Sequence, residues 1–228
     1  MSQRWVRVLA LTGALWMVLI VVGNDVLGDS GSAPGVDDPP SAFAEYYANE
    51  IDTVAWVSVA IDIAGFGFGL VFVGFIASRL REAGSFGSIA GVAGAVALAI
   101  KLGSAAPQLT AMYRADEGLD PEIVKTLIDL NGFAFLITFL PLGIFAIATS
   151  LGALSAGIAP KWTCWLGVVS GVALFVGMPL AVSGPGFLGM LAFIVWTVAF
   201  SVAMAIRPGP AVVEQPVDDA GTVHGALR

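Results

Sequence analysis

Histidine and cysteine are almost missing from this chain, which has one of each in 228 residues. Cys164 lies in an apolar stretch, so a disulfide framework and a paired-cysteine metal or redox site are excluded. His224 lies in the polar tail, which excludes haem held by two histidines within a membrane and an HExxH zinc site. We therefore expect no metal and no cofactor.

Charged residues are also scarce. They make up 12% of the chain, against 57% hydrophobic residues and a mean hydropathy of +0.90, whereas an average soluble domain is about 25% charged. The apolar residues come in runs of about twenty, enough to cross a hydrocarbon core of roughly 30 Å. Lipid is therefore the predicted solvent. The net charge of −7 argues against nucleic acid as a partner, because nucleic acids bind basic surfaces.

The apolar runs predict an all-α polytopic transmembrane helix bundle of about six spans. The spans are expected near residues 6–26, 51–77, 88–106, 127–150, 162–182 and 187–206. The first run is too long for a signal peptide, and Pro34 disfavours cleavage nearby, so we expect a retained helix. Pro107 follows the third run, and Pro141 should kink the fourth helix. Residues 1–207 form one transmembrane domain, followed by a disordered cytoplasmic tail at 208–228.

Basic residues fall on one side of the membrane if the spans alternate in direction: Arg4, Arg7, Arg79, Arg81, Lys161 and Arg207. The positive-inside rule then places both termini in the cytoplasm of a bacterial cell. Seven carboxylates and no basic residue lie between Asp25 and Asp52, so the outer surface should be acidic. In this loop Tyr46 and Tyr47 are predicted to join an interfacial aromatic belt.

Two spans share a sequence pattern that indicates an internal repeat. Residues 61–68 of the second span (IDIAGFGF) align with residues 128–135 of the fourth (IDLNGFAF). Acidic residues are rare inside spans, so a shared Asp-x-x-Gly-Phe is harder to ascribe to chance than the abundant Gly, Ala and Val. Duplication of a two-helix hairpin would give parallel repeats, with Asp62 and Asp129 at equivalent depths.

The candidate site consists of polar residues inside predicted spans. Charged residues there are costly and usually face protein or water. Asp62, Lys101 and Asp129 are the charged candidates, with Asn131 and Gln108 nearby. Helical spacing gives each aspartate a face shared with glycine, and Lys101 a face of small and polar residues. If these faces meet, Lys101 lies between two carboxylates in the outer half of the bundle. Such a cluster has a net charge of −1 when fully ionised, and could hold a proton or attract a cation.

Simpler interpretations stay open at this point. Lys101 lies close enough to Pro107 to extend its ammonium group to the outer interface. Asp129 could pair locally with Lys125, one helical turn earlier. A purely structural ion pair between Lys101 and Asp62 is the third interpretation, because removing one partner of a buried pair costs about 3–5 kcal/mol.

The pattern of the second to fifth spans, ending in Gly157-Ile158-Ala159-Pro160-Lys161-Trp162, resembles a group of small membrane proteins. These are uncharacterised Ala/Gly/Val-rich polytopic proteins of actinobacterial type, containing a domain of unknown function. The resemblance implies no activity, and no functional residue is transferred from it.

The sequence favours a non-enzymatic accessory or small-solute-binding membrane protein. The alternative is a small transporter or ion- or proton-translocating protein that uses Asp62, Asp129 and Lys101. An enzyme is not expected, because no nucleophile–base pair or metal cluster can be assembled from the sequence. The lipid bilayer is the expected surrounding. A second copy, another membrane protein, and a small solute or ion are the partners left open.

Overall fold

A computed structural model describes residues 2–28, 33–49, 51–183 and 187–206. Its long elements are helices, and none of the residues it describes forms a strand. Six of the helical segments are long and apolar enough to cross a membrane, which confirms the predicted all-α polytopic bundle. In lipid this is the expected outcome, because a helix satisfies its backbone polar groups within its own segment. The predicted tail at 208–228 and His224 lie outside the described residues.

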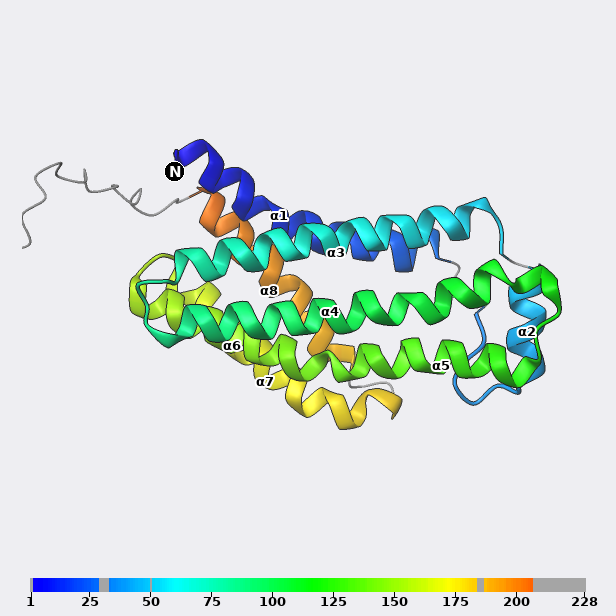
Figure 1. Cartoon of the computed structure of the whole chain (residues 1–228). Coiled ribbons are helices and arrows are strands. Elements are labelled where there is room, and N and C mark those ends of the chain that lie inside the picture. The colour runs from blue at the N-terminus through cyan, green and yellow to red at the C-terminus, as the bar shows by residue number, and fades with distance from the viewer. Residues whose placement is uncertain (1, 29–32, 50, 184–186, 207–228) are drawn as a thin grey trace, which may run out of the picture.

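Figure 1 shows the helices of the bundle, labelled in chain order. They are α1 (Gln3–Val21), α2 (Pro40–Asn49), α3 (Thr53–Arg79), α4 (Ser85–Tyr113), α5 (Pro121–Ile137), α6 (Phe139–Ala156), α7 (Lys161–Gly177) and α8 (Phe187–Ile206). A π-helical turn at Val22–Leu27 extends α1. The short α2 lies across one end of the bundle, roughly perpendicular to the long helices (Figure 1).

Carboxylates fix where two of the long helices begin. The Asp52 side chain accepts a hydrogen bond from the backbone N–H of Ala55, at 3.0 Å, and so caps the start of α3. Asp120 accepts from the N–H of Glu122, at 2.9 Å, with Pro121 at the first position of α5. These side chains satisfy N–H groups that have no partner within the helix, and proline there lacks the N–H altogether.

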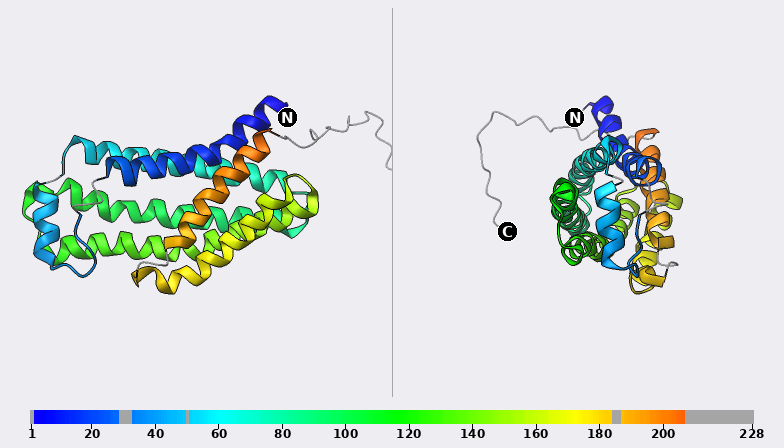
Figure 2. Two further views of the ribbon diagram at one scale, coloured as in Figure 1. Left: turned by 180° about the vertical axis from the view of Figure 1, so that it is seen from behind. Right: turned by 90° about the vertical axis from the view of Figure 1, so that its right-hand side faces the viewer.

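Small residues and a row of aromatic rings hold the bundle together. The buried face of α4 includes Gly87, Ala90, Ala93, Gly94 and Ala97, which let neighbouring helices approach closely. On the opposite side α8 runs diagonally across the bundle, in contact with α1 and α7 (Figure 2). Its buried rings continue into α3 and α6; the cluster comprises Phe72, Phe145, Phe193, Trp196 and Phe200.

Glycines in α7 serve packing within the chain. A Cβ atom added at Gly171 would lie 2.7 Å from the backbone oxygen of Gly143 on α6. Gly167 lies against the side chains of Ser150 and Trp196. The Gly-xxx-Gly pair of α7 therefore faces α6 and α8 of the same chain.

Two prolines act differently from one another. Helix α4 continues through Pro107 to Tyr113, beyond the end of the apolar run that predicts the third span near residues 88–106. The predicted kink in the fourth span is present as a break at Thr138, between α5 and α6. Pro141 has no N–H to donate to the carbonyl of Ile137, and this missing bond explains a break three residues before the proline.

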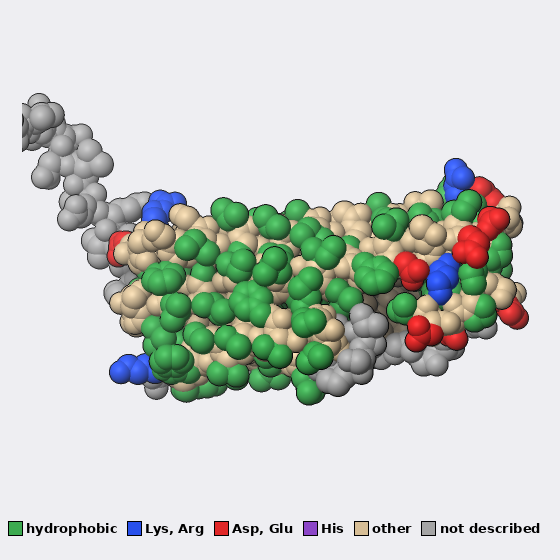
Figure 3. All heavy atoms as spheres, turned by 90° about the horizontal axis from the view of Figure 1, so that it is seen from below, with side chains coloured by type: hydrophobic (Ala, Val, Ile, Leu, Met, Phe, Trp, Pro, Cys, Tyr) green, Lys and Arg blue, Asp and Glu red, His purple; other side chains and the backbone are tan. Residues whose placement is uncertain are grey.

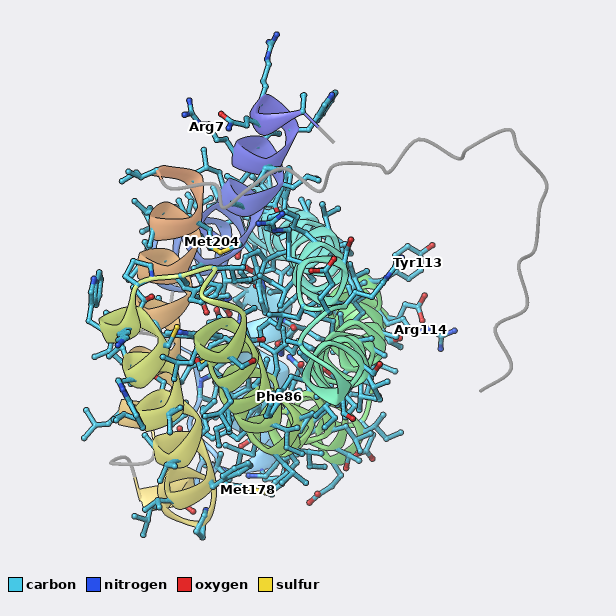
Figure 4. The ribbon with its side chains drawn as sticks, turned by 90° about the vertical axis from the view of Figure 1, so that its left-hand side faces the viewer. Arg7, Phe86, Tyr113, Arg114, Met178 and Met204 are labelled. Atoms are coloured by element: carbon cyan, nitrogen blue, oxygen red, sulfur yellow. The ribbon has the colours of Figure 1, made fainter. Side chains whose placement is uncertain are left out.

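Charge divides the molecule into a basic end and an acidic end (Figure 3). At the basic end lie the start of α1, the α3–α4 connection and the start of α7, with Arg4, Arg7, Arg79, Arg81 and Lys161. The acidic end contains α2 and the start of α5. There Tyr113 and Arg114 point away from the bundle (Figure 4), and Arg114 pairs with Glu117 at 3.8 Å.

The acidic end is closed by a cap, which we define as residues 33–49. Phe43 and Tyr47 of α2 are buried in a small cluster with side chains of α3, α4 and α5. Lys125 of α5 donates hydrogen bonds to the carbonyl oxygens of Val36 and Asp38, both at 2.7 Å. Its Nζ atom also lies 4.9 Å from the centre of the Phe43 ring. One lysine thus attaches the cap to α5.

The predicted interfacial role of Tyr47 is wrong. Tyr47 is only 9% exposed, and burial raises the pKa of its phenol above the ordinary value, so the group stays neutral. Tyr46 is half-buried and contacts Tyr47 edge to face, with ring centres 5.4 Å apart. The sequence did not reveal the small helix that turns Tyr47 inward.

We predict that Lys125→Met loosens the cap while leaving the bundle folded. Loss of charge-assisted bonds worth roughly 1.5–3 kcal/mol should speed amide hydrogen exchange in residues 36–49 by about tenfold or more. Hydrogen–deuterium exchange measured by mass spectrometry checks this. Lys161→Met, at the exposed start of α7, is the matched control and should leave cap exchange unchanged. Equal exchange in both variants would show that Lys125 does not hold the cap.

Candidate functional site

A cavity of about 460 Å³ lies in the half of the bundle nearer the acidic end. Its wall comes from α1, α3, α4, α5, α6 and α8, and is predominantly apolar and aromatic. The lining residues include Trp16, Met17, Ile20, Asn24, Phe66, Leu98, Lys101, Asn131, Gly132, Phe135, Thr138, Phe187, Met190 and Phe193. The volume falls within the range of roughly 300–1,000 Å³ that is typical of small-molecule sites.

Lys101 is joined to a polar cluster between α4 and α5. Its Nζ atom donates a hydrogen bond to Oδ1 of Asn131 at 2.8 Å, and Ser104 Oγ donates to the same oxygen at 3.1 Å. Asn131 Nδ2 donates in turn to Oε1 of Gln108 at 2.7 Å. The ammonium group also lies 5.4 Å from the centre of the Phe135 ring. The amide of Asn131 thus connects three side chains of α4.

Asp62 takes part in a second contact, between α3 and the end of α1. Its Oδ2 atom accepts a hydrogen bond from Nδ2 of Asn24 at 2.8 Å, and its other carboxylate oxygen lies against Gly23. Ser58 Oγ donates to the carbonyl oxygen of Gly23 at 2.8 Å. Gly23 and Asn24 belong to the π-helical turn that extends α1, and such turns often occur at functional sites.

The contact of Lys101 with Asn131 and the contact of Asp62 with Asn24 lie close together. Asp62 is close enough to attract Lys101 electrostatically, although the hydrogen-bond acceptor of Lys101 is the amide of Asn131 rather than a carboxylate. Asn24 and Lys101 both line the cavity, whereas Asp62, which accepts a hydrogen bond from Asn24, is not among the lining residues. Four of the five predicted site residues, Asp62, Lys101, Asn131 and Gln108, are therefore brought into one region.

Asp129 does not join them. It precedes Asn131 by two residues on α5, a rotation of about 200° around the helix, so the two side chains leave from different faces. No hydrogen bond or ion pair among the described residues links Asp129 to Lys101. The expectation that Lys101 lies between two carboxylates is thus wrong, because a neutral amide occupies the second position.

Two of the simpler interpretations are also corrected. Lys101 does not extend to the outer interface, since its ammonium group is bonded inside the bundle to Asn131. Lys125 does not pair with Asp129, since it bonds the carbonyl oxygens of the cap.

Sequence reasoning missed Asn24 and the aromatic wall. Asn24 could have been found, because it is a polar residue near the end of a predicted apolar span. Trp16, Phe135 and Phe193 had no such signal, since aromatic residues in spans are common and only the folded chain shows which ones surround a cavity.

A second hollow, of about 570 Å³, lies between α4 and the α5–α6 segment. Its lining is almost entirely aliphatic, from Ile89 and Val92 on α4 to Ile137 and Ile144 across the break. It lacks a polar cluster such as that at Lys101, so the first cavity is the better candidate site.

The chain matches no protein-family model, no curated protein and no solved structure. The resemblance to actinobacterial membrane proteins stays a prediction, and the site must be interpreted from its own chemistry.

We predict that Asn131→Leu lowers the free energy of unfolding by about 1–3 kcal/mol, because the ammonium group of Lys101 loses its acceptor in a partly buried position, whereas Ser104 keeps the backbone oxygen of Lys101. Denaturant titration of purified protein in mixed detergent micelles measures this. Asp129→Leu is the matched control on the same helix and should change stability by less than about 0.5 kcal/mol. Equal losses in the two variants would contradict the importance assigned to the amide.

Proposed function

We propose that the protein is a non-enzymatic membrane protein that binds a small solute in the cavity beside Lys101. One observation carries this proposal: an apolar cavity of about 460 Å³ has convergent polar groups, Lys101 and Asn131, on one part of its wall. Ligand sites combine these features, because apolar walls supply affinity and a few fixed polar groups orient the ligand.

The residue types at the wall favour binding over catalysis. Among the described lining residues Lys101 is the only ionisable one. Its ammonium group is bonded to an amide, and no second titratable group on the wall stands ready to exchange a proton with it. A nucleophile–base pair would need such a second member.

We place the protein in the cytoplasmic membrane of a bacterial cell, and the charge asymmetry of the two ends supports an orientation with the basic end inside. In that orientation the cavity lies in the outer half of the membrane, and the cap covers the outer surface. A solute taken from the outer leaflet or the outside would reach the cavity by the shorter route.

Ion or proton translocation is the alternative function. It needs three charged residues acting together, and Asp129 lies apart from the other two. What favours it still is Asp62, a half-buried carboxylate within a span that bonds Asn24 at the cavity wall. The geometry supports solute binding better, because the cavity wall presents an ammonium group rather than a chain of titratable groups.

Native mass spectrometry of the protein released from gentle detergent tests the proposal. We expect one small molecule bound per chain in the wild type. Gly132→Leu should abolish the bound mass, because Gly132 lines the cavity and a Cβ atom there meets nothing within 4 Å. Gly103→Leu is the control: this glycine is equally unobstructed but is not a lining residue, and the bound mass should remain. Absence of a bound molecule from the wild type, or its persistence in Gly132→Leu, would refute solute binding in this cavity.

A further inference from the structure

The ammonium group of Lys101 has more N–H donors than there are hydrogen-bond acceptors around it among the described residues. An ammonium group has three N–H donors. Within the described part of the chain, Nζ of Lys101 has one hydrogen-bond acceptor, Oδ1 of Asn131, while the Phe135 ring covers another side. Lys101 also lines the cavity. Donor capacity is therefore left for an acceptor atom inside the cavity.

The charge balance of the cluster differs from the sequence expectation. With Asp129 apart, Lys101 and Asp62 together have a net charge of zero when ionised, rather than −1. The Asp62 carboxylate accepts a hydrogen bond from Asn24 and is not among the groups that line the cavity. A ligand in the cavity thus contacts the ammonium group of Lys101 and does not contact the Asp62 carboxylate directly. This arrangement favours a ligand with a negative group over a cation.

The rest of the wall is suited to an apolar body. Rings from three helices, Trp16, Phe135 and Phe193, are joined by aliphatic side chains of α1 and α8. A small, wholly polar solute would leave these side chains without a partner. A volume of about 460 Å³ is that of a site for one drug-sized molecule, so a single-chain ligand is expected.

We infer that the ligand is a single-chain amphiphile with an acidic head group. Its carboxylate accepts a hydrogen bond from Lys101, and its apolar chain lies along the aromatic wall towards Trp16 and Phe193. Asn131 acts as a positioning residue, because its amide fixes the direction of the ammonium group. This inference rests on the proposed function and adds the chemical class of the ligand.

Binding of radiolabelled myristate to the purified protein in a nonionic maltoside detergent tests the inference, at a near-neutral pH at which a carboxylic acid is ionised and an alkylammonium group is protonated. Unlabelled myristic acid, myristyl alcohol and myristylamine compete for the site, and they share one chain but differ in head group. We expect the acid to compete at least about tenfold better than the alcohol and the amine, a typical ratio for one charge-assisted hydrogen bond.

Variants connect this preference to Lys101. Lys101→Met should weaken myristate binding about tenfold or more, to the level of the alcohol, while retained binding of the alcohol shows that the cavity is still folded. Lys101→Arg keeps a positive donor and should keep the preference for the acid. Lys161→Met, at the basic end, is the matched control and should bind as the wild type does.

The outcomes separate the two proposals. If the alcohol or the amine competes as well as the acid and Gly132→Leu abolishes binding of all three, the acidic head group is refuted while solute binding in the cavity stands. If myristate shows no displaceable binding to the wild type, the inference is also refuted, and the native mass spectrum still decides whether the cavity holds another solute. A full preference for the acid in Lys101→Met would overturn the role given to that lysine.

Discussion

A lysine inside a membrane span must find polar partners within the protein, and this constraint shapes the acidic half of the bundle. Placing an unpartnered charge at the centre of a membrane helix costs roughly 2.5–3.5 kcal/mol on insertion scales. Lys101 avoids that cost through the amide of Asn131, which also binds Ser104 and Gln108. These hydrogen bonds join α4 to α5 by polar contacts, whereas the basic half is held by glycine, alanine and aromatic rings packed edge to face or tilted.

The break at Thr138 explains why a cavity lies beside the hydrogen bonds of Lys101 and Asn131. On one side of the break α6 packs along α4 and α7; on the other, α5 packs along α4 and the cap helix α2. The chain thus changes neighbours where Pro141 removes a helical hydrogen bond. Phe135, Thr138 and Leu142, which flank the break, all line the cavity. A kink predicted from one proline therefore leaves space between α5 and the helices α1 and α8.

The sequence was sufficient for the class of fold and for the grouping of charge at two ends, because both depend on composition and on the alternation of spans. It also predicted five site residues, four of which the structure brings into one region, because polar groups within a membrane are stabilised by contact with one another. It failed at the choice between Asp129 and Asn131. These residues differ by two positions on one helix, and only the packing of α5 against α4 decides which of them faces Lys101. The prediction for Tyr47 failed for a similar reason, because no local sequence pattern reveals the helix that buries it.

The two halves of the proposed repeat show how one pattern can support different sites. The segments α3 and α5 run in the same direction from the acidic end, as a parallel repeat requires. Asp62 and Asp129 occupy matching positions in the pattern, yet among the described residues it is Asp62 that bonds a polar residue of the cavity wall, Asn24. Two residues later the first segment has Ala64 and the second has Asn131, the residue that binds Lys101. Lys101 thus bonds Asn131 of α5, whereas Asp62 bonds Asn24 at the end of α1. That separation, rather than a direct ion pair, leaves the ammonium group able to meet a ligand.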